Sequence, residues 1–273
     1  MRVSYDYEGT VAIVTGAARG VGRAITAAFV AAGARVVAAD RDADGLAETC
    51  TGLGDAVSAV VADITGAEGA RTIVQAATAR FGRLDFCVNN AAVAPHAALL
   101  DERVEVWDTV YAVNCRGTFL MTQAAARVLI EQGRGGRIVN FSSGVSSRGS
   151  AGAAAYASSR AATESFTRVA AIELAVHDIL VNCVSPGLID TQPKPLPPSM
   201  ADSLGRRIPA LPLARPGEPD EVAQLVLWLC SDASSYVTGT VLSIDGGAGV
   251  GSRAGAPIVD EDVRYDWVTG RDR

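Results

Sequence analysis

The sequence predicts an α/β fold, a single doubly wound domain with a seven-stranded parallel sheet and helices on both faces. Short β-branched apolar runs alternate with longer segments of helical period from Val11 to Ile244, the pattern of parallel strands joined by crossover helices. The 273 residues suit one such domain, and a hydrophobic content of 49% supplies its core. We therefore expect one domain over residues 1–247, without internal repeats, and an extension over 248–273.

Composition argues against several classes of protein. The net charge of −6 disfavours partners that are themselves strongly negative, so we expect neither nucleic-acid nor membrane binding. No apolar run approaches the ~20 residues that span a membrane. Residues 1–9 hold no apolar secretory core, and we expect a cytoplasmic protein. The five cysteines and two histidines lack metal-ligand spacing, so we predict no metal site.

The first strand, Val11–Thr15, runs into a glycine-rich turn and then a helix that ends near Gly33. This layout lets backbone N–H groups and a helix amino terminus face a pyrophosphate. The spacing is G-x-x-x-G-x-G rather than G-x-G-x-x-G, and glycine-rich turns also serve close packing. In the strand–turn–helix context we predict a Rossmann-type dinucleotide site that uses Gly16, Arg19, Gly20, Val21 and Gly22.

The second strand, Arg35–Ala39, ends in Asp40. A carboxylate at this point can accept hydrogen bonds from both adenosine ribose hydroxyls and would repel a 2′-phosphate. The sequence therefore favours NAD, with NADP the less favoured cofactor. Arg19 and Arg41 leave this choice open, since either is a possible phosphate ligand or an ordinary partner of Asp40.

The third strand, Val57–Val61, precedes Asp63 and Ile64, which are placed for the adenine edge; a helix then spans Ala67 to Phe81. The fourth strand, Leu84–Val88, runs into Asn89, Asn90, Ala91 and Ala92. The asparagines either make local turn bonds or brace the central strand. In the second case the small alanines let the cofactor lie close.

A helical stretch over residues 104–132 holds Asn114 at its middle, where a buried asparagine disfavours helix and needs partners at both ends of its amide. The fifth strand, from Gly136 to Ser142, delivers Ser143 to the carboxyl edge of the sheet, where open α/β sheets bind ligands. Tyr156 then opens a helix that reaches about Val176, and Arg160 lies one turn further along the same helix face. A hydroxyl, a phenol and a cation gathered there could polarise a carbonyl and pass it a proton.

The remaining pattern comprises a strand over 180–184, a loop over 185–191, a helix over 219–231 and a strand over 241–244. The proline-rich segment 192–216, with a helical piece near 199–208, predicts a lid over the substrate. For the extension 248–273 we predict packing across a subunit boundary through Tyr265 and Trp267.

Together these motifs resemble the short-chain dehydrogenase/reductases over about residues 9–247. The resemblance rests on Thr15–Gly22, Asp63, Asn89–Ala92, Asn114, Ser143, Tyr156, Pro186–Gly187, Thr191 and Asp245–Gly247. It implies that Tyr156 is the general acid/base, that Ser143 polarises the carbonyl and that Asn114 holds a water in a proton relay. It also implies cofactor contacts from Tyr156 and Arg160, and nicotinamide contacts from Pro186, Gly187, Ile189 and Thr191. Finally, it implies a homodimer or homotetramer formed through the helices at 104–132 and 154–176, and we expect the tetramer.

One position departs from the family pattern, because Tyr156-Ala-Ser-Ser-Arg160 stands in place of Tyr-x-x-x-Lys. In the family the lysine bonds the nicotinamide ribose and lowers the tyrosine pKa. Arginine keeps the positive charge but is wider and planar. Either lysine has drifted to arginine in a chain whose only lysine is Lys194, or the site has been repurposed. The intact remainder of the site favours a working enzyme.

The leading hypothesis is hydride transfer between NAD(H) and a secondary alcohol or ketone. The alternatives are an NAD-binding protein without redox activity and a non-redox lyase or cyclase. The stretches expected to line the substrate pocket are mostly small and apolar, so we expect a neutral, hydrophobic ketone or alcohol. Arg148 and Arg206 are the residues available for an anionic group.

Overall fold

A computed structural model describes residues 3–191, 201, 204–205 and 207–251. Its sheet has seven parallel strands in the order β3-β2-β1-β4-β5-β6-β7. The order reverses between β1 and β4, and ligands of open α/β sheets bind beyond the strand ends at such a point. The predicted fold class is confirmed. The strands are β1 Val11–Thr15, β2 Arg35–Asp40, β3 Val57–Val61, β4 Phe86–Asn89, β5 Gly136–Phe141, β6 Ile179–Pro186 and β7 Val241–Ile244.

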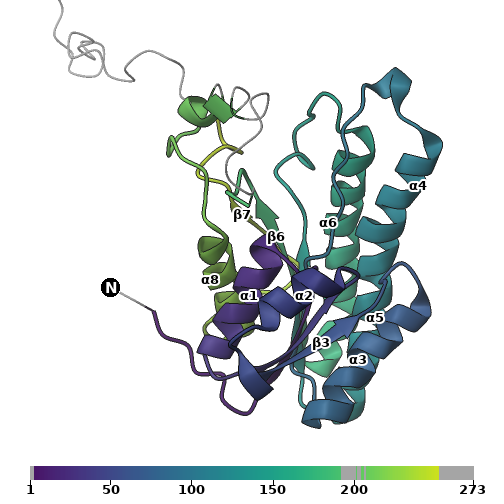
Figure 1. Ribbon diagram of the computed structural model, residues 1–273, viewed down its shortest axis with the longest axis vertical. Coiled ribbons are helices and arrows are strands. Elements are labelled where there is room, and N and C mark those ends of the chain that lie inside the picture. Colours follow the sequence, from purple (N-terminus) through teal and green to yellow (C-terminus); the bar gives the residue numbers. More distant parts are fainter. Residues whose placement is uncertain (1–2, 192–200, 202–203, 206, 252–273) are drawn as a thin grey trace, which may run out of the picture.

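Helices cover both faces of this sheet (Figure 1). One face carries α1 Gly20–Ala31, α2 Ala43–Cys50 and α8 Pro219–Cys230; the other carries α3 Ala67–Phe81, α5 Thr118–Gln132 and α6 Ala154–Leu174, with α4 Val104–Tyr111 packed beside α6. A π-helical segment, Ala112–Gly117, joins α4 to α5. Short 3-10 turns lie at Gly54–Ala56, Leu99–Asp101, Ala175–His177, Ile208–Ala210 and Asp232–Ser234.

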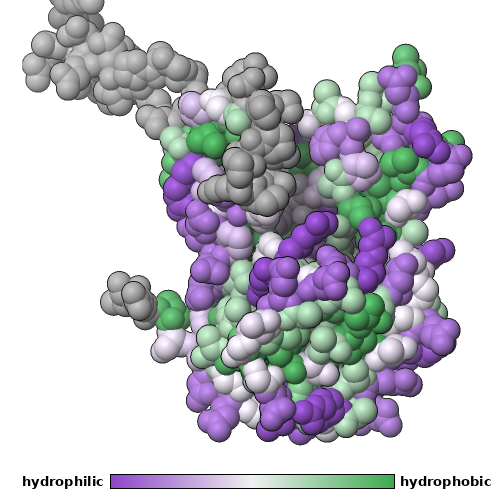
Figure 2. All heavy atoms as spheres, in the orientation of Figure 1, coloured by the Kyte–Doolittle hydropathy of each residue, from purple (hydrophilic) through white to green (hydrophobic). Residues whose placement is uncertain are grey.

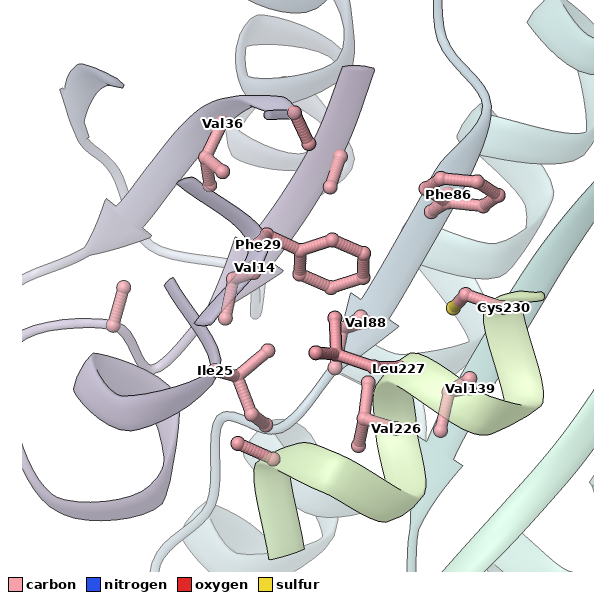
Figure 3. Packing of buried hydrophobic residues seen from close by; sticks show 14 of the residues in the cluster. Val14, Ile25, Phe29, Val36, Phe86, Val88, Val139, Val226, Leu227 and Cys230 are labelled. Atoms are coloured by element: carbon pink, nitrogen blue, oxygen red, sulfur yellow. The ribbon is translucent and has the colours of Figure 1, made fainter. Parts of the chain in front are cut away.

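The core on the α1/α8 face is almost wholly apolar. Ile25 and Phe29 of α1 and Val226 and Leu227 of α8 converge on the valines of the central strands, as Figure 3 shows. The Phe29 ring lies 5.7 Å from that of Phe86 and 5.5 Å from that of Tyr7, centroid to centroid. Burial of such side chains contributes roughly 1.5–3 kcal/mol each, so this face anchors the sheet.

The structure departs from the sequence prediction at several elements. Helix α2 was not predicted; its amino terminus is capped by Asp42, whose carboxylate accepts from the Gly45 N–H at 3.0 Å. The stretch 104–132 is not one α-helix, because the π-helical turn around Asn114 interrupts it. Strand β6 is longer than expected at both ends, and β4 begins later.

Two predicted regions fall mostly outside the described residues. Of the substrate lid at 192–216, the structure describes residues 201, 204–205 and 207–216, and Arg206 and Lys194 lie outside. The extension is described only to residue 251, so Tyr265 and Trp267 also lie outside.

Within the residues that the structure describes, two kinds of feature are absent: a membrane-spanning helix and a metal-ligating cluster. No helix in these residues is both long and apolar enough to cross a lipid bilayer. The same residues contain no group of three histidine, cysteine, aspartate or glutamate side chains that could together ligate a metal ion.

Candidate active site

The glycine turn after β1 is shaped by close backbone contact. Gly16 has φ +68°, and a Cβ on Gly22 would lie 2.1 Å from the Gly16 carbonyl oxygen, so α1 could not begin this close to β1 with any larger residue. Asn90 Nδ2 lies 2.9 Å from the Thr15 carbonyl oxygen and 3.1 Å from that of Gly16. Of the two interpretations of the asparagines, the structure shows the brace on the central strand rather than a local turn bond.

A cleft of 540 Å³ opens at the carboxyl ends of β1, β2 and β4. The surface around it is hollowed between the α8 side and the α4/α6 side of the molecule, with hydrophilic side chains along the lower rim (Figure 2). Most of the residues predicted to bind a dinucleotide line this cleft, namely Gly16, Arg19, Gly20, Val21, Gly22, Asp40, Arg41, Asp63, Ile64, Asn90, Ala91, Ala92 and Thr191.

Asp40 stands at the end of β2 and supports the glycine turn. Its Oδ2 accepts from the Ala18 N–H at 3.1 Å, and its Oδ1 accepts from the Asp42 N–H at 3.1 Å. Each carboxylate oxygen retains a lone pair for a further donor, as a ribose hydroxyl would require. The carboxylate is therefore positioned on the cleft wall by the same loop that would surround a pyrophosphate.

Of the residues assigned to the nicotinamide half, Thr191 lines this cleft, whereas Pro186, Gly187 and Ile189 lie further along the strand ends. Gly187 donates its N–H to the Ile244 carbonyl at 3.0 Å, and a Cβ there would lie 2.7 Å from Asp245. Ile189 pairs with Gly217 through an isolated parallel bridge. Pro186 closes β6, next to the loop that holds Ser143, since the Pro186 carbonyl accepts from the Gly144 N–H at 3.2 Å.

Ser143, Tyr156 and Arg160 come together at the end of β5. The Arg160 guanidinium carbon lies 5.2 Å from the centroid of the Tyr156 ring. Burial raises the pKa of Tyr156, but the Arg160 charge and hydrogen bonds with Ser143 and Arg160 outweigh it and leave the phenol pKa below its usual value. A phenol held in this state is a better general base than a free tyrosine and remains able to donate a proton.

Arg160 lies deep in the fold, with only 3% of its surface exposed. Its Nη1 donates to the Phe141 carbonyl oxygen at 2.7 Å, whereas its buried Nε has no hydrogen-bond partner among the described residues. The guanidinium thus ties α6 to the last residue of β5 and still carries an unused donor beside the phenol.

Asn114 lies on the π-helical turn, completely buried. Its Oδ1 accepts from the Val93 N–H at 3.0 Å, and its Nδ2 donates to the Val93 carbonyl and to Ser159 Oγ, each at 3.0 Å. Both ends of the amide are therefore satisfied, as the buried position requires. The side chain therefore fixes the loop after β4 against Ser159 of α6.

Sequence reasoning missed several residues that hold this site together. Ser159 bonds Asn114, and Thr163 Oγ1 lies 3.3 Å from the Asn114 carbonyl oxygen. Glu164, with side-chain exposure of 14%, bonds two serines of the loop after β5. A usable signal existed for Glu164, because it lies one helical turn after Arg160, on the side of α6 that faces the sheet.

Comparison with known proteins adds an independent observation. A family model described as enoyl-(acyl carrier protein) reductase matches residues 16–249. The chain is 41% identical over 244 residues to a 3-oxoacyl-[acyl-carrier-protein] reductase of Thermotoga maritima, covering 88% of this chain and 98% of that protein.

Two solved structures are also similar. A short-chain type dehydrogenase/reductase from Mycobacterium marinum is 36% identical with a TM-score of 0.82, over 89% of this chain and 96% of the other. A 3-ketoacyl-(acyl-carrier-protein) reductase from Brucella melitensis, in complex with NADH, is 33% identical with a TM-score of 0.81, over 89% of this chain and 99% of the other. The matched span contains both the cleft and the residues around Tyr156.

Proposed function

The chain belongs to the short-chain dehydrogenase/reductase family of oxidoreductases, and we propose that it transfers a hydride between NAD(H) and a secondary alcohol or ketone. The observation that carries this proposal is the lowered pKa of the Tyr156 phenol at the carboxyl edge of the sheet. Burial raises this pKa, but the Arg160 cation and the Ser143 hydroxyl lower it by more. The Thermotoga maritima relative, by its name, reduces an oxo group, which is the same class of reaction.

The residues of the cleft fit a dinucleotide. The turn around Gly16 and Gly22 leaves no room for a Cβ, so its backbone stays open to a pyrophosphate, and the Asp40 carboxylate faces the cleft from the end of β2. A bound nicotinamide would supply or accept the hydride. Orientation of the substrate and stabilisation of its oxygen are the tasks of the protein side chains.

In the reducing direction, Ser143 donates a hydrogen bond to the carbonyl oxygen and Tyr156 transfers its phenolic proton to that oxygen while the carbonyl carbon receives the hydride. The Arg160 charge stabilises the phenolate that remains. In the oxidising direction the phenolate takes the hydroxyl proton. Each group therefore acts on the same oxygen, and proton transfer by one positioned side chain contributes typically 10²–10⁴-fold.

Replacing Tyr156 with phenylalanine tests the scheme directly. We expect Tyr156→Phe to lower kcat by about 10³-fold while the dissociation constant for NAD changes little, since the phenol acts on the proton rather than on cofactor binding. Steady-state rates and a fluorescence titration with NADH measure the two quantities. A fully active phenylalanine variant would rule the scheme out.

NAD rather than NADP is the proposed cofactor. Asp40 would lie against the 2′ position, where a phosphate would meet a carboxylate, and the Brucella melitensis relative was obtained with NADH. Arg19 and Arg41 also line the cleft and are the reason to measure both cofactors. Tighter binding of NADPH than of NADH would contradict the choice.

The first substrates to test are 3-oxoacyl thioesters, following the names of the Thermotoga maritima and Brucella melitensis relatives. Neutral, hydrophobic alicyclic ketones and alcohols are the second group. Net oxidation of NADH by any of them would exclude a lyase or cyclase. If NAD binds but no member of either panel is turned over, and Arg160→Lys then becomes active, the protein binds NAD without redox activity.

We propose that the active form is a homotetramer or homodimer, assembled through the outer faces of α4, α5 and α6. These faces expose Val104, Phe119, Val169 and Ile172, beside a hollow of 820 Å³ that includes Tyr111 and Phe166. Ile172→Glu would then lower the mass observed by sedimentation. Truncation after residue 251 tests whether the extension contributes to the same assembly.

A further inference from the structure

We propose that Glu164 is a positioning residue, which anchors the loop after β5 to α6 and thereby holds Ser143 opposite Tyr156. The inference rests on the function proposed above, because it assigns Glu164 a role in the same reaction. No part of it requires Glu164 to touch the substrate or the cofactor.

The anchor consists of two hydroxyl groups that meet one carboxylate oxygen. Ser142 Oγ donates to Glu164 Oε1 at 2.6 Å, and Ser146 Oγ donates to the same oxygen. The two serines lie immediately before and three residues after Ser143. Glu164 therefore holds the loop on both sides of the residue that bonds Tyr156.

The proton of each hydroxyl has a competing acceptor, and the carboxylate is the stronger one. Ser142 Oγ lies 3.4 Å from the Arg160 carbonyl oxygen, well beyond its 2.6 Å distance from Glu164. Ser146 Oγ lies 2.8 Å from the Ser143 carbonyl, but the Ser146 N–H already donates to that carbonyl at 2.9 Å. Since hydrogen bonds to an ionised acceptor are roughly twice as strong as neutral ones, both hydroxyl protons point to Glu164.

The turn that Ser146 closes begins at Ser143 itself, because the Ser143 carbonyl accepts from the Ser146 N–H. On the other side, Ser142 is fixed to β6 by its own N–H, which donates to the Val184 carbonyl at 2.7 Å. Arg160 adds a bond from α6 to the Phe141 carbonyl. Phe141, Ser142 and Ser146 are therefore all bonded to α6 or β6. Because these residues flank Ser143, they fix the position of its hydroxyl.

A surface ion pair does not account for Glu164. Its Oε2 lies 3.8 Å from Nη2 of Arg168, whose side chain is 55% exposed, and such pairs contribute little. Nor does Glu164 act on the phenol through its charge, since Arg160 and Ser143 account for the lowered pKa of Tyr156. The carboxylate does act on its neighbour Cys183, where burial raises the thiol pKa to about 12 and Glu164 adds to that effect. Glu164 therefore influences the phenol through the loop that it holds.

The test compares Glu164→Leu, which removes the acceptor, with Glu164→Gln, which keeps an acceptor oxygen in the same place. Glu173→Leu, at an exposed glutamate of the same helix, is the matched control. For Glu164→Leu we expect kcat to fall about 10- to 100-fold, because small misplacement of a reacting group costs this much. We expect the NAD dissociation constant to stay within about twofold, and Glu164→Gln to recover most of kcat.

A second measurement does not depend on turnover. The phenol of Tyr156 is titrated by ultraviolet difference absorbance, with Tyr156→Phe as the subtracted reference. Because the bond from Ser143 lowers the phenol pKa, its loss in Glu164→Leu should move the titration to higher pH, whereas Glu164→Gln and Glu173→Leu should not. A role in stability alone would lower the unfolding midpoint without moving this titration.

The outcomes separate the two proposals. If Tyr156→Phe retains full activity, the proposed function fails whatever Glu164 does. If Tyr156→Phe is inactive but Glu164→Leu matches Glu173→Leu in kcat and in the phenol titration, the positioning role is overturned and the proposed function stands. A loss of kcat in Glu164→Leu that Glu164→Gln does not reduce would also overturn it, because the acceptor would then not be the property that matters.

Discussion

Both faces of the sheet have an apolar core, but they differ in the polar side chains that they bury. On the α1/α8 face, apolar side chains from strands and helices fill the space, with Phe29, Phe86 and Tyr7 at the centre. On the α3/α5/α6 face, a line of buried amides and hydroxyls crosses the sheet: Asn89 donates to Thr122 Oγ1 and to Asn140 Oδ1, and Asn140 donates to Thr167 Oγ1, at 2.9–3.0 Å. The buried Arg160 belongs to this second face.

Apolar packing and a buried polar network have different physical effects. An apolar core depends on volume and shape and stabilises the sheet without orienting any one group. A buried polar network depends on having every partner in place and fixes directions, which a catalytic group requires. Apolar packing on both faces therefore holds the sheet together, while the polar network of the α3/α5/α6 face fixes the directions of side chains near the ends of β4 and β5. Four substitutions test this division, from the largest expected effect to the smallest.

Phe29→Ala should have the largest effect on stability. Removing a fully buried ring between Tyr7 and Phe86 should lower the free energy of unfolding by about 3–5 kcal/mol. Below the unfolding transition, kcat per folded molecule should not change. Urea unfolding and activity at low temperature measure the two. A variant whose kcat fell along with its stability would show that the two faces are not independent.

Asn140→Leu should cost about 2 kcal/mol, because an Asn89 amide hydrogen loses its acceptor and stays buried. Unlike Phe29→Ala, it should also lower kcat, since the network that orients the end of β5 is broken. Val139→Ala, on the neighbouring residue and the opposite face, is the control. Equal kcat in the two variants would contradict the distinction between the faces.

Arg160→Met should reduce kcat at neutral pH by about tenfold and change its pH dependence. In the proposed alcohol oxidation Tyr156 must be deprotonated, so the rate should rise as the pH passes through the phenol pKa. Because Arg160 holds that pKa down, its removal should move the rising limb to higher pH, and Arg160→Lys should move it much less. A pH–rate profile over the alkaline range measures the direction of this shift. If the rising limb of Arg160→Met stayed at the wild-type pH, the charge would not act on the phenol.

Tyr7→Phe should have the smallest effect. The Tyr7 hydroxyl donates to the Leu227 carbonyl, and its loss should lower the free energy of unfolding by about 1 kcal/mol while the ring keeps its packing. Activity should stay at the wild-type level. A loss as large as that of Phe29→Ala would mean that this face also depends on a directed polar contact.

The sequence predicted most of the fold because its signals are local. The limits of β1, β3, α3 and β7 follow from β-branched runs and helical periods read within each segment. Helix α2 was missed because its eight residues carry few apolar positions, although Asp42 is an ordinary capping residue. The π-helical turn was missed because nothing local marks it; Asn114 was recognised as unfavourable in a helix, but its partners lie at Val93 and Ser159.

The same contrast between local signals and long-range contacts applies to the residues of the candidate site. The glycine turn, Asp40, Tyr156 and Arg160 were identified because each occupies a position that its own motif defines. Glu164 lies one helical turn after Arg160, but it was missed because a glutamate on a long helix ordinarily faces water. Its partners, Ser142 and Ser146, are brought onto it only by the fold. The direction of the Arg160 guanidinium, toward the Phe141 carbonyl, likewise depends on how α6 packs on β5.

The residues that line the cleft lie mostly in the first part of the sequence, and this placement matters for exchange of gene segments. Apart from Thr191, every residue that lines the 540 Å³ cleft lies at or before Val113, whereas Ser143 and Tyr156 come later. A crossover in the gene between these two stretches would keep the cleft residues up to Val113 together and would replace Thr191, Ser143 and Tyr156. A chimera joined after residue 117, between the π-helical segment and α5, would be the laboratory counterpart of such a crossover.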